Sequence, residues 1–562
     1  MPLPTSNTPW PPRHLADAFG QYSTCQVWWE GDADKLSASS GEPSRATVGG
    51  GGFMQRIRRL FWGTSRDAAQ QPRQLHVPVA ADIVQTAATV LLPEPVTFRP
   101  ADDDTIANPA ARKRIDKILN SPQTHAGMVS AAEACSALGD VYGRIVWNAD
   151  ICDHAWIDWV DADAAIPEFM YGRLWAVTFW TVVDENTDEN RVLRHLERHE
   201  AGYHTIDEDG ERVPVWGRIY HGLYEGTAVS LGRRIDLAAH SETASIPVVE
   251  GTDFVYTGSM RLTAWHIANG GRNPAFRAQP VLQHLGRSDI GDPAVIGLMD
   301  QIDETYSSLS RDVRLAKARL LVSEFLLDMK SPGKPATFST EQEIYERVGG
   351  APSATPVLEA HQFQIRVADH LQTAEGYLRA ILRRIGFSPF TFGLADQSGG
   401  PMTATEVDAK RDATTATYKA RSGAWRSVLA GAARTLIEVD AAVFGTGATL
   451  GQDLEVSWPP AARESLETKA RNLGVLASSR SASMEWRVRY LNPTYDDTAV
   501  ADEVKKIRDD DAVADPLALG ADQPFAKPEP EPDPEPDEGE AEDDTGDDDT
   551  GDEDDDALAD AA

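Results

Sequence analysis

The stretch DPAVIGLMDQIDETYSSLSRDVRLAKARLLV, residues 292–322, carries the pattern that decides the fold. Asp292 is a predicted N-cap, and Pro293 stands at the first helical position, where a missing N–H costs little. Apolar residues then recur at spacings of three and four, the period of an amphipathic helix. They are Val295, Leu298, Met299, Ile302, Tyr306, Leu309 and Val313. We therefore predict a long helix that begins at this point.

A second apolar stripe of the same period follows after an interruption. It consists of Phe363, Val367, Leu371, Ala374, Leu378, Ile381 and Ile385. Residues 329–356, between the two stripes, are rich in Pro, Gly, Ser and Thr, so we expect them to be non-helical. Each helix would span roughly 40–50 Å at a rise of 1.5 Å per residue. The sequence thus predicts a stalk of two helices with an irregular tip.

The rest of the chain predicts an α+β fold around this stalk. Residues 1–75, with Trp10, Trp28 and Trp29 among Pro-rich and Gly-rich segments, read as a peripheral arm. Helices are expected near 79–92, 108–119, 128–138, 403–439, 461–476, 484–491 and 498–509. Strands are expected near 142–147, 156–160, 174–183, 192–199, 202–205, 216–224 and 454–458. The strands between 142 and 224 predict a mostly antiparallel sheet, in which 174–183 is fully buried. Thr403 and Glu406 form a capping box at the start of the long helix.

The net charge of −35 is concentrated at one end of the chain. From Glu529 onward there are 19 acidic residues and no Lys or Arg, so the remainder carries −16. The acidic end lacks apolar residues to bury, and residues 516–562 are expected to be disordered. An acidic body argues against tight, sequence-independent DNA binding, which needs an excess of Lys and Arg. It does not exclude a passage through which DNA slides.

No segment indicates a membrane or a secretory route. The N-terminus lacks the charged and apolar regions of a signal peptide, and the most apolar run, 174–183, is too short to span a bilayer. The three cysteines, Cys25, Cys135 and Cys152, have no metal-binding spacing and indicate a reducing compartment. We expect a soluble protein that contacts no membrane.

No motif for catalysis or for a cofactor is evident. Gly333-Lys334 lacks the earlier glycine of a P-loop. His195 and His199 are four residues apart beside Glu197 and Glu200, but the local pattern is that of a strand rather than the helix of a zinc protease. Solvated strand histidines are the preferred interpretation and a metal site the alternative. We therefore predict no catalytic residue, no cofactor and no metal.

Several segments, taken in order, resemble one family. They are TPWPP (8–12), HVPVAADIVQTAA (76–88), RHLERHEAGYH (194–204), YHGLYEGT (220–227), GRSDI (286–290), LMDQIDETYSSLSRDVRLAKARLLV (298–322), TFGL (391–394) and TATEVDAKR (403–411). Together they resemble the portal proteins of tailed bacteriophages, in the branch typical of long-tailed phages of actinobacteria. The resemblance covers roughly residues 8–510. The N-terminal arm, the short tip insertion and the acidic tail depart from the family.

The resemblance implies a portal fold with the following parts. They are an N-terminal arm (1–75), a mixed α/β wing (76–291), stem helices (292–328 and 357–386), a clip (329–356), a channel loop (387–402), a long wing helix with a short strand (403–460), a helical crown (461–515) and the disordered acidic tail (516–562). It also implies a head–tail connector, a homododecameric ring at one vertex of the virion capsid that is assembled in the host cytoplasm. Double-stranded DNA would pass through its channel without sequence specificity during packaging and ejection. The implied partners are the terminase large subunit, a head-completion or adaptor protein, and the major capsid and scaffold proteins.

The implied roles fall on three groups of residues. The channel loop contributes Phe392, Asp396, Gln397, Ser398, Gly399 and Gly400, and residues 387–402 contain no Lys or Arg. Basic residues on the flanking helices could face phosphate: Arg379, Arg383, Arg384, Lys410 and Arg411. Solvated helix faces or ion pairs between subunits are the alternative for these. Glu341, Glu343 and Glu346 in the clip would dock the motor or adaptor.

Two functions of other classes remain open at this point. A DNA-processing enzyme of the packaging machinery would need a P-loop with an acidic strand end, or a clustered acidic metal site, and neither is readable. A minor capsid or scaffold-like protein could share the acidic tail but would not need paired stem helices.

Overall fold

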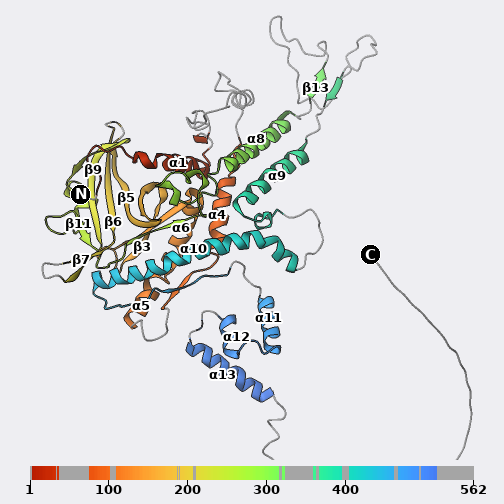
Figure 1. The fold of residues 1–562 in the computed structure, drawn as a ribbon. Coiled ribbons are helices and arrows are strands. Elements are labelled where there is room, and N and C mark those ends of the chain that lie inside the picture. Colours follow the sequence, from red (N-terminus) through yellow and green to blue (C-terminus); the bar gives the residue numbers. More distant parts are fainter. Residues whose placement is uncertain are drawn as a thin grey trace, which may run out of the picture. The chain divides into compact units, whose positions relative to one another are not determined.

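The computed structural model describes most of the chain up to residue 514. The described residues are 3–32, 35–36, 75–100, 109–186, 188, 190–206, 211–315, 319–322, 358–361, 366–394, 404–460, 466–492, 495 and 497–514. The chain divides into two units, Met1–Ala462 and Arg463–Ala562. Figure 1 shows the helices and strands of both units.

The larger sheet of the first unit is antiparallel throughout, as the alternating pattern predicts. Its order is β10-β9-β6-β5-β4, and β11 also pairs with β9. The strands are β4 (Ala165–Met170), β5 (Arg173–Asn186), β6 (Arg191–Glu200), β9 (Arg218–Thr227), β10 (Ser230–Ile235) and β11 (Phe254–Tyr256). The prediction that 174–183 is fully buried is wrong, because Trp175 and Val182 are exposed and only the middle of β5 is covered. The buried residues of β5 are Ala176–Phe179, and burial decreases from there toward both ends of the strand.

Smaller sheets connect distant parts of the chain. One has the order β12-β2-β3, made of β12 (Ala264–Ala268), β2 (Asp140–Val146) and β3 (Trp156–Asp161). β1 (Thr97–Arg99) pairs with β15 (Glu455–Ser457), and β7 (Tyr203–Ile206) pairs with β8 (Arg212–Val215). The periodicity did not predict β1, β4, β8 or β10 to β12.

Four helices of the first unit precede or cover the sheets. They are α1 (Ala16–Glu30), α4 (Val79–Leu91), α5 (Pro109–Ile118) and α6 (Pro122–Leu138). α6 begins six residues before its predicted start, because Ser121 accepts a hydrogen bond from the Thr124 N–H and Pro122 occupies the first helical position. The short helices are η1 (Arg13–Leu15), η2 (Ala162–Ala164), η3 (Leu237–Ala239), α7 (Ser241–Ala244), η4 (Pro274–Phe276), η5 (Leu282–His284) and η7 (Pro389–Phe392).

The N-terminal residues belong to the core. Trp10 is 3% exposed and packs edge-on against Trp180, and Trp28 is also buried. Tyr22 and Cys25 fill the inner face of α1. The prediction of a peripheral arm is therefore wrong for residues 3–32, where the Pro-rich and Gly-rich composition hid a helix.

The predicted helix pair is present but shorter than expected. α8 (Pro293–Leu315) and α9 (Val367–Ile385) pack side by side (Figure 1). Asp292 caps α8, since its carboxylate accepts the Ala294 N–H at 2.9 Å. Beyond the helices, β13 (Arg319–Val322) pairs with β14 (Leu358–His361), although both were assigned to stem helices. Short apolar runs such as Arg319–Val322 do not distinguish a strand from a helix by period alone.

The chain then continues into α10 (Ala404–Phe444), close to the predicted 403–439. Thr403 of the capping box lies outside the described residues. The second unit contains α11 (Leu466–Ser478), α12 (Met484–Leu491) and α13 (Asp497–Ala514), and the three predicted helices are confirmed. Residues 515–562, which include the acidic tail, lie outside the described residues. Within the described residues, no helix is long and apolar enough to cross a membrane.

Candidate functional site

The segment at the base of the helix pair, residues 286–292 (GRSDIGD), connects several elements of the first unit. We call it the junction segment. Gly286 donates its N–H to Asp140 of β2 at 2.7 Å, and Asp140 also accepts from His266 of β12 at 2.6 Å. Gly139, which ends α6, has a φ of +97°, and a Cβ there would lie 2.7 Å from the backbone nitrogen of Ser288. The close approach of the two segments therefore requires this glycine.

Ser288 organises the turn that leads into α8. Its hydroxyl donates to the Ala137 carbonyl of α6 and accepts from the N–H groups of Ile290 and Gly291. The Cys25 thiol of α1 also donates to it at 3.4 Å. Burial raises the pKa of Cys25 to about 11, so this thiol stays protonated at neutral pH.

Asp289 holds the junction segment to α10. Its carboxylate accepts two hydrogen bonds from the guanidinium of Arg421, at 2.9 and 2.7 Å, and one from the Ser136 hydroxyl at 2.6 Å. The side chains of Arg421 and Asp289 are 9% and 2% exposed. A bidentate buried pair of this kind fixes the relative position of two elements, because losing either partner leaves a buried charge.

A second ion pair joins the ends of the two stalk helices. Arg384, in the last turn of α9, donates to the carboxylate of Asp292 at 2.9 and 2.6 Å. Arg384 is half exposed, so this pair is screened by solvent. The junction segment thus meets α9 at Asp292 and α10 at Asp289.

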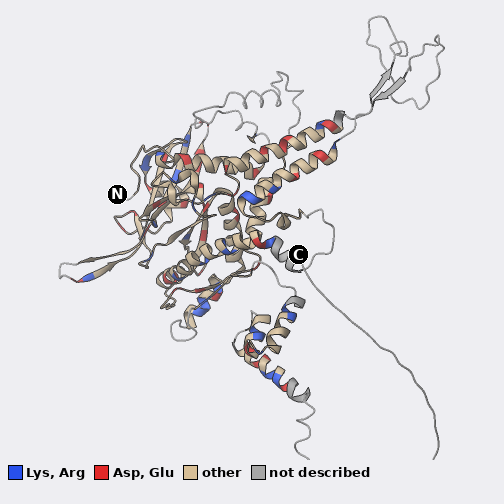
Figure 2. Ribbon diagram, turned by 45° about the vertical axis from the view of Figure 1, so that its right-hand side comes forward, with Lys and Arg blue, Asp and Glu red and all other residues tan. Residues whose placement is uncertain are grey.

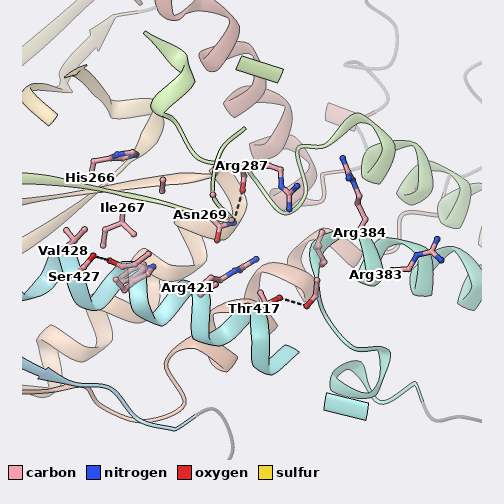
Figure 3. A pocket seen from close by; sticks show the side chains of 18 residues that line it. His266, Ile267, Asn269, Arg287, Arg383, Arg384, Thr417, Arg421, Ser427 and Val428 are labelled. Atoms are coloured by element: carbon pink, nitrogen blue, oxygen red, sulfur yellow. Dashed lines mark hydrogen bonds between the residues drawn. The ribbon is translucent and has the colours of Figure 1, made fainter. Parts of the chain in front are cut away.

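An open pocket of about 670 Å³ lies beside the junction segment. Figure 3 shows its lining arriving from the end of β12, the junction segment, the end of α9 and the middle of α10. Its polar members include four arginines, Arg287, Arg383, Arg384 and Arg421, and no Asp or Glu lines it. Ile267, Ile385, Trp425 and Val428 supply apolar wall. The pocket therefore combines positive charge with an apolar surface, a combination suited to an anionic partner.

The residues predicted to face phosphate are mostly engaged within the chain. Arg379 is paired with Glu375 one turn earlier, and Arg384 with Asp292. The guanidinium of Arg411 lies 5.4 Å from the centre of the Phe390 ring. Arg383 lines the pocket and is exposed, and the side chain of Lys410 lies outside what the structure describes. Arg379 and Arg384 are thus paired within the chain while their side chains stay partly exposed.

The predicted channel loop is only partly described. Its first residues are folded: the Ser388 N–H donates to Thr414 of α10 at 2.8 Å, and Phe387 packs edge-on against Phe392. Phe392 is thus packed against the core rather than free in a loop. Asp396, Gln397, Ser398, Gly399 and Gly400 lie outside the described residues, as do Glu341, Glu343 and Glu346 of the predicted clip.

The prediction of solvated histidines on β6 is wrong for His199. His199 is fully buried, bonded to Glu197 at 2.6 Å and to Thr263 at 2.7 Å, and Glu197 also accepts from Arg144 of β2. Burial alone would raise the pKa of Glu197, but Arg144 and His199 outweigh it and hold this pKa well below its usual range. The network sits between the two sheets, a location that the strand pattern alone could not reveal. Within the described residues, no group of three or more His, Cys, Asp or Glu is placed to hold a metal.

A stacked histidine pair completes this network. His195 and His221 lie with ring centres 5.3 Å apart, nearly parallel, and their nitrogens approach to 3.2 Å. Burial lowers the pKa of His221 to about 4 and also lowers that of His195. Both rings are therefore neutral at physiological pH and belong to the interior.

The sequence analysis missed Arg287, Asp289 and Arg421 as site residues. GRSDI entered only as a segment of family resemblance, with no role for its charges. One signal was readable: Arg421 lies three residues after Tyr418 and four before Trp425, on the buried face of α10. A charged residue on an apolar face indicates a buried partner.

The solved structures that are similar to this chain include two neck structures. No protein-family model matches the chain, and no curated protein matches it. A structure described as the neck of an empty GTA (gene transfer agent) particle, computed with C6 symmetry, is similar over 76% of this chain and 94% of that chain, at 13% identity and a TM-score of 0.36. The neck of a native GTA particle, computed with C12 symmetry, is similar over 82% and 98%, at 12% identity and a TM-score of 0.34. With TM-scores below 0.5, these similarities do not establish a shared fold.

Proposed function

We propose that this chain is a portal protein, the head–tail connector of a tailed phage particle. Twelve copies would form a ring at one capsid vertex, through which double-stranded DNA passes during packaging and ejection. The N-terminal residues, sheets and α10 would form the wing, α8 and α9 the stem, and α11 to α13 the crown. The order of the family-like segments supports this assignment, because it runs from residue 8 to residue 411 without rearrangement.

The observation that carries the proposal is the uneven burial of the helix pair. Near the base, Val295, Met299 and Ile381 are buried, so the stripes cover each other and the core. At the outer end, where Asp312 of α8 meets His370 of α9, Val313 is 48% exposed and Leu371 44%. Long helices gain most of their stability by packing their apolar face. The apolar stripe continues beyond the part that the chain itself buries. Exposed apolar surface of this kind favours packing against further copies of the chain.

The charge distribution supports a conduit. A duplex carries one charge per about 1.7 Å, and each Lys or Arg contact with phosphate deepens binding. Arg379 and Arg384, both close to the base of the stalk, are paired with carboxylates of their own chain. Pairing of this kind limits phosphate contacts, which suits DNA that must slide.

The proposal is tested by imaging the purified full-length protein. Negative-stain electron microscopy is expected to show rings with a central hole, and mass photometry is expected to give the mass of twelve chains, about twelve times 61.2 kDa. Single chains at every concentration that the two methods can reach would contradict it.

The two alternative functions predict different results for the same purified protein. A DNA-processing enzyme of the packaging machinery would cleave or translocate DNA in the presence of Mg²⁺ or ATP. A minor capsid or scaffold-like protein would bind the major capsid protein without forming a ring with a central hole.

In the proposed portal, the acidic residues of the clip would dock the terminase large subunit and the adaptor. They are Glu341, Glu343 and Glu346.

A further inference from the structure

The pocket beside the junction segment is a basic site in an acidic protein. The chain carries −35 in total, and −16 without the 19 acids from Glu529 onward. Two identical acidic bodies repel each other on average, so their association needs local charge complementarity. Figure 2 shows Lys and Arg at the base of α9 and Asp and Glu along α8. Arg383 and Arg384 at this end of α9 line the pocket. An acidic partner that approaches the pocket is therefore attracted electrostatically.

The charges inside the pocket do not cancel. Arg421 is neutralised by Asp289, and Arg384 by Asp292. For Arg287 and Arg383, the described part of the chain offers no carboxylate within ion-pair distance. Arg287 is half-buried, which strengthens its interaction with an incoming carboxylate relative to a fully exposed pair. Arg383 stands on the rim, with its side chain directed away from Arg421 (Figure 3). Two positive charges are therefore left for a ligand.

The size and wall of the pocket favour a protein segment over DNA. A volume of about 670 Å³ lies in the range of pockets that enclose a drug-sized ligand or a few side chains. Trp425, Val428 and Ile385 offer apolar contact to the methylene groups of such side chains. A duplex is a rod with its phosphates on a convex surface, and it would reach only the rim.

We propose that this pocket receives an acidic segment of a neighbouring copy of the chain, whose carboxylates pair with Arg287 and Arg383. The inference rests on the proposed function, because it requires a ring of identical copies. In a ring, each contact joins two different surfaces of the same chain, head to tail. The basic pocket is one of these surfaces, and an acidic surface of the next copy is the other.

Charge reversal tests the proposal. Arg287→Glu together with Arg383→Glu is expected to raise the concentration needed for ring assembly at least tenfold, as measured by mass photometry. The matched control is Arg426→Glu, an exposed arginine on α10 that does not line the pocket; it is expected to leave assembly unchanged. Thermal unfolding midpoints verify that each variant folds. If the double reversal does not fold, Arg287→Gln with Arg383→Gln replaces it and is expected to weaken assembly in the same direction.

A cross-link identifies the partner directly. Arg287→Lys and Arg383→Lys keep the positive charge and introduce an amine, which a zero-length carbodiimide joins to a carboxylate in contact. Rings assembled from equal parts of ¹⁴N- and ¹⁵N-labelled chains are expected to yield mixed-isotope cross-linked peptides at these lysines. Intact rings whose lysine cross-links lie only within one chain would overturn the inference.

The remaining outcomes separate the alternatives. If the double reversal leaves rings intact but abolishes binding of a 30-base-pair duplex in fluorescence anisotropy, the pocket is a phosphate site and the inference is wrong. If wild-type chains form no rings, the proposed function fails first. If wild-type and doubly reversed chains form rings at the same concentration, only this inference fails.

Discussion

Asp289 is the residue on which the position of α10 relative to the stalk depends. It is 2% exposed and holds Arg421 through two hydrogen bonds, while Ser136 occupies one of the same carboxylate oxygens. Asn at this position could keep part of the geometry, but it would leave a guanidinium buried without a counter-charge. Breaking a buried pair on one side is more damaging than replacing both partners.

We therefore expect Asp289→Asn to lower the free energy of unfolding by about 3–5 kcal/mol. The measurement is urea unfolding followed by tryptophan fluorescence, because Trp425 lies one turn from Arg421. Asp292→Asn is the matched control: its partner Arg384 is half exposed, and Asn still caps a helix, so a loss below about 1 kcal/mol is expected. Equal losses of unfolding free energy in the two variants would show that burial does not make the Asp289–Arg421 pair more important for stability than the exposed pair.

The His195–His221 pair makes a prediction about pH. Burial holds the pKa of His221 near 4, against an ordinary 6.5, so between these values the unfolded chain takes up a proton that the folded chain refuses. Stability is therefore expected to fall as the pH drops from 6.5 to 4, by about 3 kcal/mol from this residue. Glu197 acts at lower pH. Because its pKa is depressed in the folded state, it stabilises the fold above about pH 4.5, and this contribution is lost as the pH falls further.

His221→Gln is expected to flatten the fall of the thermal midpoint between pH 6.5 and pH 4.5. His204→Gln is the control, since His204 is an exposed histidine on β7. If the thermal midpoint of His221→Gln falls with pH as steeply as that of the wild type, other groups cause the acid sensitivity.

At the scale of elements, the two ends of the helix pair α8–α9 are expected to have different roles, one in folding and the other in assembly. The base of each stripe is buried within one chain, whereas Val313 and Leu371 at the outer end are exposed. Exposed positions contribute little to the stability of a single chain. Under the proposed function, we expect their apolar side chains to pack against other chains.

Val313→Asp together with Leu371→Asp is expected to abolish rings in mass photometry while leaving the helical circular dichroism signal unchanged. Ile381→Asp, at a fully buried position of the same pair, is expected to unfold the chain instead. The partly buried Leu309 and Leu378 are expected to be intermediate, losing rings and some stability when changed to Asp. Rings of unchanged mass in the first variant would contradict the stem assignment.

The sequence predicted best those elements that have a sustained period or a marked start. α8 and α9 were readable because a helical period of apolar residues continues over more than ten residues, and α10 because a capping box marks its predicted start. α1 was not, because its inner face mixes Ala18, Tyr22 and Cys25 with polar residues among Pro-rich and Gly-rich flanks. β1 and β12 were missed because they have only three and five residues, and such short strands form only through partners that are distant in sequence. The site followed the same rule: Arg383 and Arg384 were predicted as site residues and Arg287 and Arg421 were not, because the pairing of Arg421 with Asp289 and of Arg384 with Asp292 is a property of the folded chain.

At the scale of the whole molecule, the acidic C-terminal residues matter through their number. If twelve chains assemble, twelve times 19 acids, or about 230 negative charges, gather in one particle. Under the proposed function, a solubilising role would keep assembled rings apart before the capsid forms. The sharper roles are to repel packed DNA or to recruit a basic scaffold segment.

Truncation after Gln523 is expected to leave ring formation intact and to cause salt-sensitive defects in head assembly or filling, because charge effects are screened as ionic strength rises. The measurement is DNA content of heads assembled at low and high salt, with full-length chains as the control. Normal heads at both salt concentrations would leave only the solubilising role.

The pairing of β1 with β15 has a consequence for how the protein is made. Thr97–Arg99 finds its strand partner only at Glu455–Ser457, and the indole of Trp458 donates to the carbonyl of Leu91 at 2.9 Å. The ribosome must therefore add 356 residues after Arg99 before the partner appears, which takes about 20 to 70 s at roughly 5–20 residues per second. During that interval Phe98 and its neighbours lack their cover, so a nascent chain is a natural client for chaperones. Translation therefore delays the folding of this part of the first unit until residue 457 has been made.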